Sequence, residues 1–100
     1  MNKPCYTEYV RHAIRFYSRY LDKTKFKSKV DEANWNACHN VIERYPIREK
    51  NILTYVYGAK DTIGDNVYAM ANKHNLHQNI IWDMMKEYEK QVAIERGLWV

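Results

Sequence analysis

A chain of 100 residues with 46% hydrophobic and 28% charged residues has the size of one ordinary globular domain, which excludes a disordered tail and a membrane span. Three glycines and two prolines are too few for the tight turns of an all-β domain, so the composition favours an all-α fold. The formal net charge is +4, and residues 1–57 carry +5 (11 basic, 6 acidic) against −1 for residues 58–100 (5 basic, 6 acidic). This mildly basic balance permits a nucleic-acid partner without requiring one.

The first predicted helix runs from about Thr7 to Leu21. Pro4 prevents an earlier start, and Thr7 is suited to the N-cap because its side-chain oxygen can accept a backbone N–H. Apolar side chains recur at helical spacing and form one broad face: Val10, Ile14, Tyr17 and Leu21, with Tyr9, Ala13, Phe16 and Tyr20 beside them. The opposite rim carries cations at four-residue steps: Arg11, Arg15, Arg19 and Lys23.

A basic connector over residues 22–29 leads to the second predicted helix, which begins after Ser28 and ends at Pro46. Ser28 and Asp31 form a capping box at its start. Two apolar stripes place this helix centrally in the domain: Val30, Ala33, Ala37, Val41 and Tyr45, and then Trp35, Cys38 and Ile42.

The third predicted helix begins at Pro46 and stops at Gly58, with Ile52, Leu53, Val56 and Tyr57 on its buried side. The fourth begins at Thr62, which forms a capping box with Asp65, and ends at Asn75, since asparagine tolerates the left-handed conformation. Its apolar residues are Ile63, Val67, Met70 and Ala71. The fifth and longest runs from about Gln78 to Arg96 and stops at Gly97. Its apolar spine is Ile81, Met84, Tyr88 and Val92, flanked by Ile80, Trp82, Met85 and Ala93.

We expect one domain over residues 1–100, composed of a helical pair at about 7–45 and a helix-turn-helix part at about 46–98. Cys5 and Cys38 make neither a zinc pattern nor a disulfide framework, so Cys38 is expected to be a buried reduced thiol. His74 and His77 form an H-x-x-H pair, but no second close pair stands at finger spacing. We therefore expect no metal and no other cofactor.

Catalytic and targeting motifs are missing from the sequence. It contains no G-x-S-x-G, P-loop or H-E-x-x-H motif, so we expect neither an enzyme nor a small-molecule substrate. No apolar stretch approaches the roughly 18 residues of a transmembrane helix, and no signal peptide precedes the first helix. A cytoplasmic protein without a membrane partner is expected.

One stretch has the pattern of a helix-turn-helix, from Val67 to Met85. This motif needs a small residue where the two helices cross, a turn residue four positions later, and an apolar residue directly after the turn. Ala71, Asn75 and Leu76 meet these requirements. Ile81 and Met84 then supply the apolar pair that faces back from the second helix. Such a pair presents the start of the second helix to the major groove of DNA.

The residues at that start are suited to DNA. His77, Gln78 and Asn79 are predicted to approach base edges, since Gln and Asn can pair bidentately with adenine. Lys73 and Lys86 are predicted to hold phosphates beside the groove. A more distant basic surface for phosphates is predicted at Arg11, Arg15, Arg19 and Lys23. Trp82 lies at helical spacing, where tryptophan is more often part of the core.

From about Arg44 to Leu98 the chain resembles region 4 of sigma factors and the small phage-type or mobile-element regulators that share its helix-turn-helix. The resemblance rests on the order of three segments: PIREKNILTYVYG, then TIGDNVYAMANKHN, then a long helix that ends in AIERGLW. It implies a role in transcription through promoter DNA, RNA polymerase or both.

A protein–protein interaction module of the same fold, without direct DNA binding, is the alternative hypothesis. Tyrosine beside arginine is frequent at protein interfaces, and four of nine tyrosines crowd on or just before the first helix: Tyr6, Tyr9, Tyr17 and Tyr20. The last helix carries Asp83, Glu87, Glu89 and Glu95 against Lys86, Lys90 and Arg96. Its acidity suits a protein partner better than DNA. A homodimer or an adaptor of the transcription machinery would fit this alternative.

Overall fold

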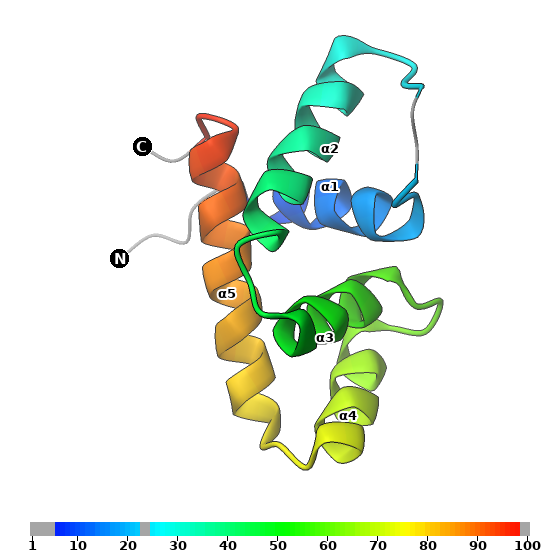
Figure 1. Ribbon diagram of the computed structural model, residues 1–100, viewed down its shortest axis with the longest axis vertical. Helices are drawn as coiled ribbons and strands as arrows, with labels where there is room; N and C mark the ends of the chain where they lie inside the picture. Colours follow the sequence, from blue (N-terminus) through cyan, green and yellow to red (C-terminus); the bar gives the residue numbers. More distant parts are fainter. Residues whose placement is uncertain (1–5, 23–24, 99–100) are drawn as a thin grey trace.

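Five helices and no strand make up the part of the chain that the computed structural model describes, residues 6–22 and 25–98 (Figure 1). The helices are α1 (Thr7–Arg19), α2 (Lys29–Ile42), α3 (Ile47–Gly58), α4 (Ile63–His74) and α5 (Gln78–Glu95). The prediction of an all-α fold with five helices is confirmed. Pro4, Cys5 and Lys23, which entered the sequence predictions, lie outside the described residues.

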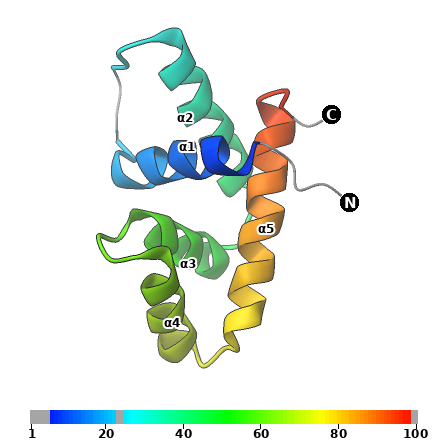
Figure 2. The same ribbon diagram turned by 180° about the vertical axis from the view of Figure 1, so that it is seen from behind.

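The longest helix, α5, forms one side of the molecule, and the other four pack against it in two pairs (Figures 1 and 2). α1 and α2 lie beside its C-terminal half, and α3 and α4 lie beside its N-terminal half. α1 also packs on α3 and so joins the two pairs. The turn between α4 and α5 stands at the end of the molecule remote from α1 (Figure 2).

The buried apolar side chains form one cluster to which all five helices contribute. Ile52, Leu53, Val56 and Tyr57 of α3 are each fully buried, as their spacing predicted. The rings of Tyr57 and Tyr88 meet edge to face at a centroid distance of 5.9 Å, a favourable geometry for aromatic pairs. Cys38 is buried as a free thiol, and burial raises its pKa to about 12.

The strongest start and stop signals in the sequence are confirmed. Ser28 Oγ accepts the N–H of Asp31 at 3.1 Å, and Thr62 Oγ1 accepts the N–H of Asp65 at 3.1 Å. Asn75 adopts the left-handed conformation with φ 54° and ψ 47°. These devices act through neighbouring residues alone, which is why the sequence locates them.

The first helix begins at Thr7 as predicted, but its predicted N-cap residue and its predicted end are wrong. Thr7 is the first helical residue, and Tyr6 stands at the N-cap position without a side-chain cap. The helix ends at Arg19 rather than Leu21, and Leu21 is 48% exposed. The Trp35 indole donates to the Tyr20 carbonyl at 2.9 Å, a contact from another helix that holds the chain in its turn.

The second helix is also shorter than predicted, since α2 ends at Ile42, well before Pro46. The N–H groups of Arg44 and Tyr45 bond to carbonyls three residues back, at 3.0 and 3.1 Å, and this tighter turn leads into the proline. Tyr45 therefore belongs to the connector. Val30, predicted on the apolar stripe, lies in the first turn of α2 and is 53% exposed.

Gly58 has a different role from the helix stop that the sequence predicted. It is the last residue of α3, and the C-cap is Ala59 in an extended conformation. A Cβ atom at Gly58 would lie 3.0 Å from the Ser18 carbonyl oxygen and 3.1 Å from Ser18 Cβ. Glycine is thus required here by the close approach of α1 and α3.

We expect Gly58→Ala to lower the free energy of unfolding by about 1–3 kcal/mol, because backbone of a packed helix must move to accept the methyl group. Gly64→Ala is the matched control, since a Cβ there meets nothing within 4 Å. Alanine's higher helix propensity should leave that variant equal to the parent or up to about 1 kcal/mol more stable. Urea unfolding of both proteins checks this, and equal effects would contradict the close approach.

Candidate nucleic-acid interface

The turn between α4 and α5 is built by backbone hydrogen bonds around Asn75. The Leu76 N–H donates to the Ala71 carbonyl at 2.9 Å, five residues back, and the Asn75 N–H donates to the Asn72 carbonyl at 3.4 Å. Leu76 packs against the core. This is a Schellman-type ending with its apolar contact, and it fixes the direction in which the chain enters α5.

The side chains between the two helices follow the predicted pattern with one correction. Ala71 is 4% exposed and Ile81 is fully buried. Met84 was predicted on the buried spine of α5 and Met85 beside it. Met85 is fully buried, whereas Met84 is only partly buried against the core. The buried stripe thus runs through positions 81, 85, 88 and 92, rotated slightly from the predicted one.

His77 caps α5. It stands at the N-cap, and its Nδ1 accepts the Asn79 N–H at 3.1 Å. The bond occupies Nδ1 and satisfies one of the free N–H groups at the helix start. The exposed His77 ring has Nε2 left to meet a ligand. The sequence pattern predicted only base contact for His77 and not this capping role, although His77 directly precedes the predicted helix.

An open hollow of about 430 Å³ lies where α4 ends and α5 begins. Ala71 and Leu76 contribute apolar surface, and the other lining residues carry hydrogen-bonding groups: Asn72, His77, Gln78 and Asn79. Gln78 and Asn79 are both exposed in the first turn of α5. The structure therefore brings the three predicted base-contacting residues together beside one surface hollow.

Two lysines and a tryptophan lie on α4 and α5 outside the lining of this hollow. Lys73 is exposed in the last turn of α4, and Lys86 is exposed about two turns along α5 from Gln78. Trp82 lies between them in sequence and is partly buried against the core. Lys73 and Lys86 are thus available to anionic groups on either side of the turn.

The predicted arginine surface on α1 lies apart from the turn and is largely engaged internally. Arg11 Nε bonds to Glu89 Oε2 at 2.9 Å. Arg19 donates to the carbonyls of Gly58 at 3.3 Å and Ala59 at 3.4 Å, the C-terminal end of α3. Arg15 lies between them, and partial burial, with Arg19 nearby, lowers its pKa.

The acidity of α5 is smaller at the surface than in the sequence. Glu89 is buried, and its Oε2 accepts bonds from Arg11 and, at 2.6 Å, from the Tyr57 hydroxyl. Glu95 pairs with Arg44 at 2.8 Å. The spacing of Glu89 from Ile81 and Met85 places it on the buried stripe, so the sequence contains a signal for its burial.

Two further residues near the site were missed. Asn66 is buried and donates to the Val56 carbonyl at 2.9 Å and the Asp61 carbonyl at 3.3 Å, which ties the loop before α4 to α3. Tyr68 is 58% exposed on α4, one turn before Asn72. No periodicity marks either residue, because a buried polar and an exposed aromatic side chain both depart from the usual pattern.

No family model, curated protein or solved structure matches the chain. Within the described residues, no helix is long and apolar enough to cross a membrane. The same residues contain no group of three or more His, Cys, Asp or Glu side chains placed to hold a metal ion.

Proposed function

We propose that the chain is a small, non-catalytic, DNA-binding transcription regulator that uses α4, the turn and α5 as a helix-turn-helix. The observation that carries the proposal is the hollow at the start of α5, where Gln78 and Asn79 are exposed beside a turn fixed by left-handed Asn75. A rigid turn that presents carboxamide groups at a helix start is suited to the major groove.

In this proposal Gln78 and Asn79 read base edges, with adenine as the preferred base because its N6 and N7 match a carboxamide. His77 Nε2 adds a polar group beside them. Lys73 and Lys86 hold phosphates, and Tyr68 on the outer face of α4 adds a hydroxyl where the first helix of such a pair crosses the DNA backbone.

The charge of α5 is compatible with DNA. With Glu89 buried and Glu95 paired, the acidic side chains of α5 left exposed and without an ion pair to another described residue are Asp83 and Glu87, so the helix is less negative at its surface than its sequence suggests. Favourable phosphate contacts must then come from individual cations rather than from the net charge of α5, which makes Lys73 and Lys86 important.

The test begins by selecting bound duplexes from a randomised pool and measuring fluorescence polarisation with an enriched and a scrambled duplex. Gln78→Ala/Asn79→Ala should weaken binding to the enriched duplex by about tenfold or more and change binding to the scrambled duplex little. Asn36→Ala/Asn40→Ala is the control, since it removes two exposed carboxamides from α2.

The lysines should behave differently from the carboxamides. Lys73→Ala/Lys86→Ala should weaken binding to both duplexes and reduce the salt dependence by about one counterion per lysine. Absence of enrichment, together with no binding to either duplex at about 50 mM salt, would count against DNA as the ligand.

A protein–protein interaction module is the second candidate, with RNA polymerase or a second copy as partner. It is favoured by α1 and its C-cap Tyr20: Arg11 and Arg19 are engaged internally, while Tyr9 and Tyr20 are 43% and 50% exposed. Exposed tyrosines beside charged groups are typical of protein interfaces. Weak salt dependence of partner binding would distinguish this candidate from DNA binding.

A further inference from the structure

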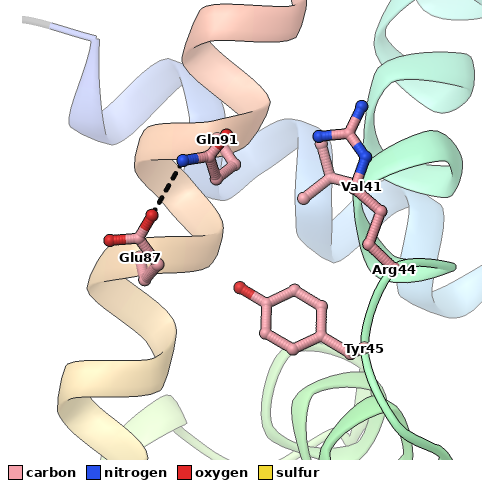
Figure 3. Close-up of a pocket in the computed structure, with 5 residues that line it drawn as sticks. All are labelled: Val41, Arg44, Tyr45, Glu87 and Gln91. Carbon is pink, nitrogen blue, oxygen red and sulfur yellow. Dashed lines mark hydrogen bonds between the residues drawn. The ribbon is translucent and has the colours of Figure 1, made fainter.

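A second hollow, of about 220 Å³, lies between the C-terminal end of α2 and the middle of α5. Its five lining residues are Val41, Arg44, Tyr45, Glu87 and Gln91, and we refer to it as the α2–α5 cleft. Figure 3 shows the Tyr45 ring between the two helices, with Glu87 and Gln91 on one side and Arg44 on the other. The cleft lies on different residues from the hollow at the start of α5.

The floor of the cleft is apolar and packs on the core. Val41 is 1% exposed, and the Tyr45 ring packs edge to face on the buried ring of Tyr88 at a centroid distance of 6.0 Å. Partial burial and the nearby Glu87 carboxylate raise the pKa of Tyr45, so its hydroxyl stays protonated and able to donate. Among the described residues that hydroxyl has no hydrogen-bond partner.

Arg44 and Glu87, the two charged residues of the cleft, are each held by one contact and keep further hydrogen-bonding atoms unengaged. Arg44 bonds through Nη2 to Glu95 at 2.8 Å and is 55% exposed, and Glu87 accepts the Gln91 amide through Oε2 at 2.8 Å. The other guanidinium nitrogens of Arg44 and Oε1 of Glu87 make no hydrogen bond within the described ranges. Positioning both groups before binding lowers the entropy lost when a partner arrives.

The arrangement of these charges fits a second copy of the chain. The cation of Arg44 comes from the α2 side of the cleft and the anion of Glu87 from the α5 side (Figure 3). A two-fold axis that passes between Arg44 and Glu87, normal to the surface, would place Arg44 of one copy over Glu87 of the other, and the reverse. Both contacts would be attractive, so the patch is complementary to itself in charge.

Two exposed apolar side chains lie close in sequence to residues of the cleft. Ile47, the first residue of α3, is 70% exposed two residues after Tyr45, and Ile94 is 44% exposed one turn after Gln91. Tyrosine and arginine at the centre of a patch are the residues that most often dominate binding energy. We propose that the α2–α5 cleft is the centre of a two-fold homodimer interface.

The test is sedimentation velocity on the full chain and on charge-reversed variants. The parent should dimerise at about 100 μM, a concentration above the micromolar dissociation constants of weak protein–protein interfaces. Arg44→Glu and Glu87→Arg should each weaken dimerisation by at least about tenfold, because each one puts like charges across the axis. Glu32→Lys, a charge reversal at the opposite end of α2, should not change it.

Mixing the two single variants is the decisive measurement. In a heterodimer of Arg44→Glu with Glu87→Arg both contacts across the axis are again attractive, so the mixture should dimerise although neither variant does alone. Misfolding of either variant cannot produce this result. A monomeric parent, variants that dimerise like the parent, or a mixture without recovery would each overturn the proposal, and none of these outcomes bears on whether the monomer binds DNA.

Discussion

Replacing Glu89 by alanine should lower the free energy of unfolding by about 2–4 kcal/mol, the largest effect of any charged residue described in this domain. The carboxylate is 6% exposed and joins three helices, because it accepts bonds from Arg11 on α1 and Tyr57 on α3. Removing it leaves the buried Tyr57 hydroxyl without its acceptor. Arg11 is 36% exposed and can turn toward water, which keeps the loss below that of a fully buried ion pair.

Glu87→Ala is the control for Glu89→Ala, since it removes an exposed carboxylate from the same helix. Its effect should stay within about 0.5 kcal/mol. Tyr57→Phe should recover part of the loss in a double variant with Glu89→Ala, because no buried hydroxyl then remains unpaired. Thermal and urea unfolding provide the measurements, and equal effects of Glu87→Ala and Glu89→Ala would show that Glu89 is not buried as described.

Met85→Ala should lower the free energy of unfolding by about 2–5 kcal/mol, while Met84→Ala should lower it by only about 1 kcal/mol. The two residues share type and helix and differ in burial, since Met85 is fully buried and Met84 only partly so. A cavity forms only where the surrounding atoms cannot follow the lost side chain. The opposite order of stabilities would favour the buried spine that the sequence predicted.

The Met84 and Met85 pair shows how far helical periodicity can be trusted. Both positions fall on a broad apolar face, so the spacing alone allows either to point inward. The position of α4 and α2 against α5 decides between them. The same reasoning applies to Glu89, whose spacing places it inside while its charge suggests a surface position. Only the nearness of Arg11 and Tyr57, 78 and 32 residues away in the chain, makes its burial favourable.

Some features of the candidate site were predictable from the sequence, and others depend on the tertiary structure. The sequence located the turn, the capping residues at Ser28 and Thr62, and the first turn of α5, and the structure brings His77, Gln78 and Asn79 together beside one hollow. The sequence did not show what the arginines of α1 contact. Arg11 and Arg19 follow a regular four-residue spacing that is typical of a solvated face, yet both bond to other helices.

By itself, the sequence determined the number of helices, most of their ends and the left-handed turn at Asn75. These depend on capping, backbone conformation and apolar spacing, which act between residues a few positions apart. The tertiary structure alone decided which charges are buried, why Gly58 must be glycine, and that the α2–α5 cleft exists. Each depends on atoms from distant helices meeting within a few ångströms, and no local pattern encodes such a meeting.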